Sequence, residues 1–232
     1  MSAPEPLVIL HLDERVVVVA KPAGLLVHRT QSGSGEEALL QRLRDQLGQR
    51  VFPVQRLDRW ASGLVAFGLD PEATADLQAG LQAPAALKEY LVLARGACPR
   101  RFECRAPLVD DKDVARTAHT TFARLAFLPG LPASLLRARL HTGRYHQIRR
   151  HLALLGHHVV GDSRYGKART NRAAARLGLT RLFLHAWRLA VPRPELGPLA
   201  VRAPLAADLR GVLARLRGAQ GVPGGPVSPV SS

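Results

Sequence analysis

The sequence predicts one globular domain in which β-strands and α-helices are mixed. Hydrophobic residues make up 47% of its 232 residues, which is enough to bury a sizeable core. Runs of β-branched residues alternate along the chain with leucines at helical spacing, so both kinds of element are expected. No repeat or linker divides residues 1–217, which should form the folded domain, whereas residues 218–232 have the Gly/Pro/Ser composition of a disordered tail.

The N-terminal elements are expected to be two strands and a helix. The two short strands surround a turn within residues 7–28, and the second is the apolar run Val16–Ala20. The helix should begin with a capping box of Ser34 and Glu37, whose side chains can satisfy free backbone amides. Gly48 is placed to end this helix.

Further strands and helices follow along the chain. Asp70 can cap a helix that has Pro71 in its first turn, and residues 87–96 predict a strand. The remaining expected elements are a strand, a turn at Thr142–Gly143 and a helix within 134–160, a short helix after the basic loop in 163–179, and a strand at 181–192. The apolar face of the helix within 134–160 should contain Ile148, Leu152 and Leu155. Residues 97–130 give no clear pattern.

The chain is strongly basic, with a formal net charge of +15. Such a charge predicts binding to a polyanion, and nucleic acid is the first class to consider. An arginine-rich composition can also arise from coding bias, but the acidic residues have not risen to match, so the positive field remains.

Localisation is predicted from what the sequence lacks. The start "MSAPEPLVILHLDE" has neither the basic nor the apolar segment of a signal peptide, and no apolar run is long enough to span a membrane. Cys98 and Cys104, with no CxxC motif, predict two ordinary thiols rather than a zinc site. We therefore expect a cytosolic protein without a membrane partner.

The stretch "FPVQRLDRWASGLVAFGLD" places Asp58 between Arg56 and Arg59. Neighbouring arginines favour the ionised form of a carboxylate. A surface ion pair would be the plain alternative, but an apolar run follows, which indicates that the segment enters the core. Ser62 and Gly63 predict a tight turn beside the acid. An ionised carboxylate held this way can act as a nucleophile or as a base.

A second candidate region is "HTGRYHQIRRHL". It concentrates six basic or imidazole side chains: His141, Arg144, His146, Arg149, Arg150 and His151. The histidines are spaced by five, which places them off a common helical face and argues against zinc. Arginines at the start of a helix favour phosphate binding, while a solvated charged face is the alternative.

Tyr90, in "KEY", is a third candidate because an aromatic ring beside a basic residue can stack on an unstacked base. A tyrosine in a strand is more often part of the core. The sequence contains no phosphate-binding Gly-rich loop, no HExxH and no GxSxG.

Five stretches, taken together, resemble the RluA-type pseudouridine synthases. They are "VVVVAKPAGLLVH", "RLDRWASGL", "KEYLVLARG", "TGRYHQIRRHLALLGHHVVGDSRYG" and "LFLHAWRLAVP", which occur in the family's order and cover the chain to about Leu209. The resemblance implies an α+β domain with a long mixed, mostly antiparallel sheet and an RNA-binding cleft across its middle. It also implies an isomerase that needs no metal and no cofactor.

The resemblance implies roles for individual residues. Asp58 corresponds to the family's essential aspartate, and Tyr90 to the tyrosine that packs against the target base and takes part in proton handling. Arg149 corresponds to the basic residue that pairs with the aspartate, with Arg144 as the alternative. Arg56 corresponds to the arginine that enters the space left by a flipped uridine. We further expect RNA contacts from Arg59, Arg144, His146, Lys167 and Arg169.

Two positions near the aspartate depart from the family pattern. Gln55 stands where the family usually has His, and Ala61, preceded by Trp60, stands where it usually has Thr. Neither change removes a group that the chemistry requires.

The substrate is predicted from "GDSRYGKARTNRAAARLGLTRLFLHA", whose basic insertion resembles the branch that modifies uridine 65 in the T stem of tRNA. Ribosomal RNA is the alternative substrate. A non-catalytic RNA-binding module and a base-releasing glycosylase are alternatives of other classes. The combination of Asp58, Tyr90 and Arg149 argues against a mere binding module, because binding requires only a basic surface. We expect a monomer with RNA as its partner.

Overall fold

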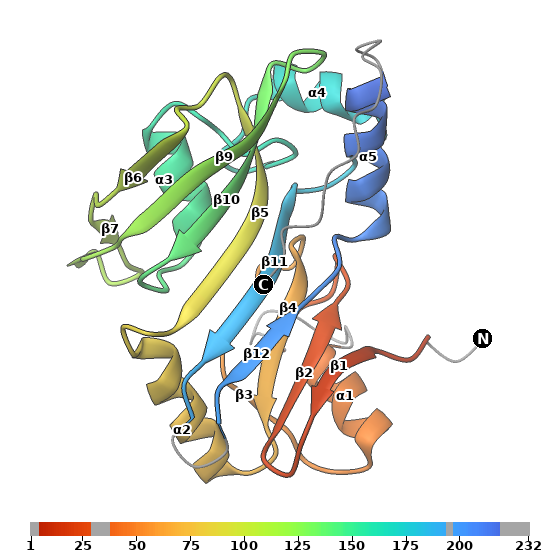
Figure 1. Ribbon diagram of the computed structural model, residues 1–232, viewed down its shortest axis with the longest axis vertical. Coiled ribbons are helices and arrows are strands. Elements are labelled where there is room, and N and C mark those ends of the chain that lie inside the picture. The colour runs from red at the N-terminus through yellow and green to blue at the C-terminus, as the bar shows by residue number, and fades with distance from the viewer. Residues whose placement is uncertain (1–4, 29–37, 194–196, 219–232) are drawn as a thin grey trace.

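The computed structural model describes residues 5–28, 38–193 and 197–218, and it shows one large sheet flanked by helices (Figure 1). The helices are α1 (Leu39–Leu47), α2 (Pro71–Gln82), α3 (Gln147–Leu154), α4 (Ala168–Arg176) and α5 (Ala207–Gly218). The strands are β1 (Val8–Leu12), β2 (Val16–Lys21), β3 (Phe52–Pro53), β4 (Ser62–Gly68), β5 (Leu87–Arg95), β6 (Arg101–Cys104), β7 (Leu108–Val109), β8 (Ala115–Arg116), β9 (Thr120–Leu128), β10 (Ala133–Leu140), β11 (Leu184–Val191) and β12 (Leu199–Arg202).

The sheet has ten strands and joins the two halves of the chain. Its order is β1-β2-β4-β11-β5-β10-β9-β6, with β3 paired to β4 and β12 paired to β11, while β7 and β8 form a separate small sheet. In the described residues β4 and β11 pair in parallel, and the other paired strands are antiparallel. The expected α+β class with a mixed, mostly antiparallel sheet is therefore confirmed.

Three apolar clusters hold the helices against the sheet. The central cluster joins α2 and α3 to the middle strands and includes Leu77, Val92 and Leu152. A second cluster packs α4 and α5 on β5 and β10, and a third packs α1 on β2 and β4. In Figure 1, α4 and α5 accordingly lie near one end of the sheet and α1 and α2 near the other.

Three local signals in the N-terminal third are confirmed: those for β2, for the end of α1 and for the start of α2. Four consecutive buried valines form most of β2, and Gly48 ends α1 with φ +66°. Asp70 caps α2, because its Oδ1 accepts a hydrogen bond of 2.7 Å from the amide of Ala73. The expected capping box of Ser34 and Glu37 lies outside the described residues.

Three predictions about helices and strands need correction. Leu155 is not on the buried face of α3, because the helix ends at Leu154 and Leu155 is exposed. The unassigned stretch 97–130 contains β6 to β9, and a bulge breaks the pairing of β9 with β10. Helix α5 was not predicted. It reaches Gly218, and the rest of the expected tail lies outside the described residues.

Candidate active site

Asp58 lies in the loop between β3 and β4, and the backbone around it is firmly held. The amide of Ala61 donates to the carbonyl of Asp58 at 3.1 Å, and the amide of Gly24 donates to the carbonyl of Arg59 at 2.8 Å. The turn is at residues 59–60, so the expected tight turn at Ser62 and Gly63 is wrong: these residues begin β4.

Gly63 has a different role from the one expected. Its φ is +109°, and a Cβ at this position would lie 2.1 Å from the carbonyl oxygen of Ala186 in β11. Only glycine allows the start of β4 to approach β11 so closely. This contact fixes the end of the Asp58 loop against the centre of the sheet.

Arg149, in the first turn of α3, is the arginine that pairs with Asp58. Its Nη1 donates to Asp58 Oδ2 at 2.9 Å, and its Nε and Nη2 donate to the two carboxylate oxygens of Asp162 at 2.7 and 2.8 Å. The Arg149 side chain is only 9% exposed and that of Asp162 is fully buried. The paired geometry with Asp162 fixes the orientation of the guanidinium that faces Asp58.

The pKa values in this cluster indicate permanent charges. Burial would lower the pKa of Arg149, but the charges and hydrogen bonds of Asp162 and Asp58 raise it above the usual value. Burial would raise the pKa of Asp162, but hydrogen bonds from Arg149 and from the amides of Tyr165 and Arg164 hold it below the usual range. Arg149 and Asp162 are thus both charged, and Arg149 also donates to Asp58.

His146 is the second group beside the aspartate. Its Nε2 lies 3.7 Å from Asp58 Oδ1, and its backbone, which precedes α3, has φ +52°. Burial is the main cause that lowers the pKa of His146 to about 4, and the charges of Arg149 and Arg164 add to it against the opposing effect of Asp58. At neutral pH this imidazole is therefore neutral, and its contact with Asp58 is not an ion pair.

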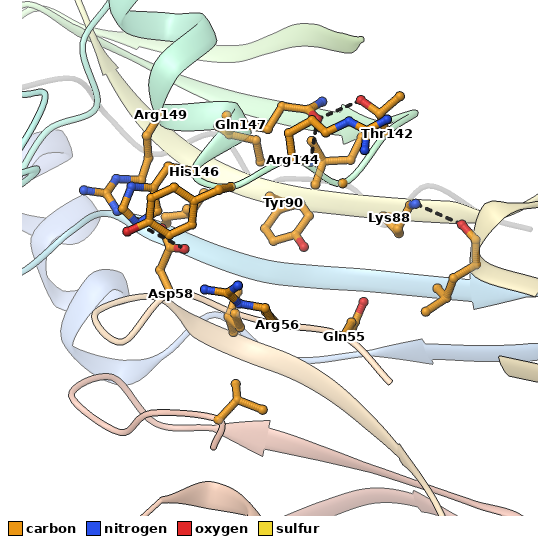
Figure 2. A pocket seen from close by; sticks show the side chains of 18 of the residues that line it. Gln55, Arg56, Asp58, Lys88, Tyr90, Thr142, Arg144, His146, Gln147 and Arg149 are labelled. Atoms are coloured by element: carbon orange, nitrogen blue, oxygen red, sulfur yellow. Dashed lines mark hydrogen bonds and ion pairs between the residues drawn. The ribbon is translucent and has the colours of Figure 1, made fainter. Parts of the chain in front are cut away.

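Asp58, Tyr90 and Arg149 line one pocket of about 930 Å³, the upper end of the range for ligand sites. Figure 2 shows Asp58 and Arg149 joined at one end of this pocket, Lys88 at the other and Tyr90 between them. Tyr90 is 9% exposed, and burial together with the charge of Asp58 raises its pKa. The phenol therefore keeps its proton at neutral pH.

The arginines next to Asp58 in the sequence make other contacts. The Arg56 guanidinium is exposed and lies over the ring of Tyr145, 5.6 Å from its centroid. Arg59 Nε donates to the carbonyl of Gly24 at 2.9 Å, and its guanidinium lies over the ring of Trp60. The carboxylate is therefore paired with an arginine 91 residues away in the chain.

The other expected RNA contacts divide into two groups. Arg144 and His146 line the pocket, and Arg144 Nε also donates to the carbonyl of Thr117 at 3.0 Å. Lys167 and Arg169 are exposed at the start of α4 and do not line the pocket.

The three histidines spaced by five have separate environments. His141 stacks on His119, and the buried His151 lies 2.9 Å from the hydroxyl of Thr120, whereas His146 is beside Asp58. Within the described part of the chain, no group of three or more His, Cys, Asp or Glu side chains is arranged to hold a metal ion.

Lys21 was missed from the sequence. It ends β2, is 1% exposed, and donates hydrogen bonds of 2.8, 2.8 and 3.0 Å to the carbonyls of Pro22, Leu25 and Arg59. Burial and then the charge of Arg181 lower the pKa of Lys21 to about 7. Its place at the end of "VVVVAK" was the available signal, because a lysine that ends a buried strand needs polar partners.

Arg181 was missed as well, and it connects the Asp58 loop to the C-terminal helix α5. It donates to Asp208 in α5 at 2.6 and 2.9 Å, to the carbonyl of Trp60 at 3.3 Å and to the Ser62 hydroxyl at 3.1 Å. Ser62 is in turn 2.9 Å from His185 Nδ1. No sequence signal joins residues so far apart.

Across the three described segments, no helix is long and apolar enough to cross a bilayer. Both cysteines are buried free thiols, as expected.

Comparison with known proteins identifies the class to which this fold and site belong. A family model described as RNA pseudouridylate synthase matches residues 15–154. The chain is 37% identical over 220 residues to a tRNA pseudouridine synthase C of Salmonella typhimurium, covering 85% of each chain. It is 34% identical to the protein of that name from Vibrio cholerae, covering 88% of this chain and 93% of the other.

Solved structures agree on the fold. Human RNA Pseudouridylate Synthase Domain Containing 4 superposes with a TM-score of 0.75 at 22% identity, covering 90% of this chain and 93% of that chain. Human RNA Pseudouridylate Synthase Domain Containing 1 gives 0.71 at 23% identity, covering 94% and 98%. The chain belongs to the RNA pseudouridylate synthase family, and it is an isomerase that acts on RNA.

Proposed function

We propose that this enzyme converts a uridine of tRNA to pseudouridine, and that the target is uridine 65 in the T stem. The relatives named tRNA pseudouridine synthase C, which align over most of their length and of this chain, support tRNA as the substrate. The net charge of +15 supports tight, salt-dependent binding of a polyanion.

The observation that carries the mechanism is the orientation of Asp58. One carboxylate oxygen, Oδ2, accepts from Arg149, while the side chain keeps 22% of its surface exposed at the pocket. Arg149 is itself fixed by Asp162, so the carboxylate is held at one position, with Oδ1 3.7 Å from His146 Nε2. Such preorganisation is what a group that reacts with a ribose requires.

The target uridine has to leave the RNA helix to reach this carboxylate, at a cost of a few kcal/mol. The exposed guanidinium of Arg56, over the ring of Tyr145 at the pocket, is placed to fill the vacated space. Tyr90 packs against the extruded uracil, and its protonated phenol takes part in proton handling.

The reaction exchanges one glycosidic bond for another. The bond between C1′ and N1 breaks, a bond between C1′ and C5 forms, the proton on C5 is lost and N1 takes up a proton. The composition of the RNA is unchanged. Asp58 acts on the ribose–base bond, and both attack at C1′ and proton abstraction from the ribose use its ionised carboxylate.

The remaining expected contacts bind the RNA outside the target. Arg59, Arg144 and the neutral imidazole of His146 lie around the Asp58 loop and the start of α3, and Lys167 and Arg169 extend the basic surface along α4. Because the lysine and arginine contacts release counterions from phosphates, affinity should fall steeply with salt concentration. An affinity that does not depend on salt would contradict this arrangement.

The test is base-resolution pseudouridine mapping on RNA from cells that lack the protein, complemented with the wild type, Asp58→Asn or Asp111→Asn. Asp111 is an exposed carboxylate between β7 and β8 and serves as the matched control. We expect one T-stem signal to disappear and to return with the wild type and the Asp111 variant, but not with the Asp58 variant.

Other outcomes identify the alternatives. Loss of a ribosomal site would replace tRNA by ribosomal RNA as the substrate. Abasic sites would indicate a glycosylase, and the loss of no site would leave only an RNA-binding module. Restoration by Asp58→Asn would remove Asp58 from the chemistry.

A further inference from the structure

Tyr145 is an exposed aromatic ring in the pocket that the proposed reaction does not use. It is 50% exposed, and among the described residues the other exposed Phe, Trp or Tyr side chains are Trp60 and Phe127. Of these three, Tyr145 alone lines the pocket with Asp58. An aromatic side chain that is left open to water beside the reacting group suggests a contact with the substrate.

The inner face of the Tyr145 ring is firmly supported. It stacks on His146 with ring centroids 3.7 Å apart and an angle of 23° between the planes. His146 Nδ1 is 3.3 Å from the hydroxyl of Tyr165, and the two rings meet edge to face. The Tyr145 hydroxyl accepts from Arg164 Nη1 at 3.4 Å. The ring is therefore held in place before any ligand arrives, which lowers the entropic cost of binding to it.

The face of the ring opposite His146, its outer face, is the one that a ligand can reach. The guanidinium carbons of Arg56 and Arg164 lie over the ring, 5.6 and 5.9 Å from its centroid, and Arg56 leaves the ring when it fills the space of the flipped nucleotide. Both distances are well beyond the 3.7 Å at which His146 stacks on the inner face. A rigid aromatic face between arginines is the arrangement with which proteins bind an unpaired nucleobase and its phosphates.

The geometry also indicates which base would bind. Asp58 and Tyr145 both contact His146: Asp58 Oδ1 lies 3.7 Å from its Nε2, and Tyr145 stacks on its ring. The outer face of Tyr145 is turned away from His146, so a uracil that reacts at Asp58 does not occupy this face. A base one step along the same strand remains to occupy it.

We propose that the outer face of Tyr145 is a stacking subsite for the nucleobase adjacent to the target uridine. The subsite rests on the proposed function, since it takes the RNA of that reaction as its ligand. Stacking there would hold the strand while the target nucleotide is turned into the pocket, so that Tyr145 contributes to RNA affinity and not to the chemical step.

The test is a binding cycle in which ring and base are removed separately and together. Wild type and Tyr145→Leu are titrated with a T-stem RNA hairpin, either intact or with an abasic nucleotide 5′ or 3′ of the target. Loss of the ring should weaken binding of the intact RNA by roughly 5- to 150-fold. One abasic position should weaken wild-type binding by a similar factor and leave the affinity of the Leu variant unchanged.

Two controls make the cycle specific. Tyr145→Phe keeps the ring and should bind within about twofold of the wild type. Trp60→Leu removes an exposed ring that lies outside the pocket, and any effect should be equal on intact and abasic RNA.

If the fold-losses in affinity from removing the ring and from removing the base simply multiply, the two groups act independently. That result would overturn the subsite and leave Tyr145 as a support for His146. Pseudouridine formation by the wild type on the same hairpin separates this result from failure of the proposed function. Turnover without coupling overturns the subsite alone. Coupling without turnover upholds the stacking subsite and rejects this RNA as the substrate.

Discussion

Replacing Asp162 by Asn tests whether the buried ion pair with Arg149 supports both the fold and the site. The substitution keeps the shape of the side chain but removes its charge. It also puts an amide donor against a guanidinium that donates to both carboxylate oxygens at 2.7 and 2.8 Å. Of its two carboxylate partners, Arg149 would then keep only Asp58.

The expected magnitude follows from burial. The Asp162 side chain is fully buried and that of Arg149 is 9% exposed, so water cannot replace the lost partner. Removing one member of such a pair costs about 3–5 kcal/mol in the free energy of unfolding. Misplacement of Arg149 by about 1 Å should also lower kcat by about 100-fold.

The assay is urea unfolding together with single-turnover pseudouridine formation. Asp76→Asn is the control, because Asp76 also accepts a hydrogen bond from an arginine, Arg15, at 2.9 Å, but these two side chains are 64% and 26% exposed. Solvent can compensate there, so we expect a loss of about 1 kcal/mol or less.

Equal losses in the two Asn variants would refute the reasoning from burial. A stability loss in Asp162→Asn without a fall in kcat would show that the pair supports the fold but does not orient Asp58.

Three further predictions concern stability, measured by urea unfolding. Lys21→Met leaves the carbonyls of Pro22 and Leu25 without this donor and that of Arg59 with the Gly24 amide alone, so a loss of about 2 kcal/mol or more is expected, and a smaller one would mean that water reaches this site. Gly63→Ala places a methyl group 2.1 Å from the carbonyl oxygen of Ala186 and should cost about 2 kcal/mol or more. The control is Gly211→Ala in α5, where the added methyl group meets open space, so this change should raise the free energy of unfolding by about 1 kcal/mol. Equal effects of the two Ala substitutions would argue against the close approach of β4 to β11. Burial, with a smaller effect of the Arg181 charge, lowers the pKa of His185 to about 4. The unfolded state therefore binds the extra proton below pH 6.5, and stability should fall by about 3 kcal/mol between pH 6.5 and 4. His185→Gln should remove that part of the slope, and an unchanged slope would assign it to other groups.

The sequence predicted elements where local chemistry determines them. Four valines in succession marked β2, and Asp70 with Pro71 marked the start of α2. Helix α5 was missed although its leucines are buried, because they become a core face only against β5 and β10. Leu155 was placed wrongly since a helical pattern continues in the sequence beyond the point where the helix ends.

The candidate site divides in the same way. The family motifs pointed to Asp58, Tyr90 and Arg149, which line one pocket, and Arg149 contacts Asp58. The residues that support this pocket, Lys21 and Arg181, gave no motif of their own. Their partners are backbone carbonyls and side chains that only the folded chain brings within reach.

The parallel pairing of β4 with β11 sets the order in which the active site can be completed. Asp58 and Arg149 are both synthesised before β11, yet Ser62 and Gly63 are fixed by partners in β11, such as His185, 123 residues after Ser62. Contacts this distant in sequence form late and slowly. A nascent chain that ends before Leu184 contains Asp58 and Arg149 but lacks the strand against which the Asp58 loop is fixed, so the pocket takes its final form only when the last strands have been made.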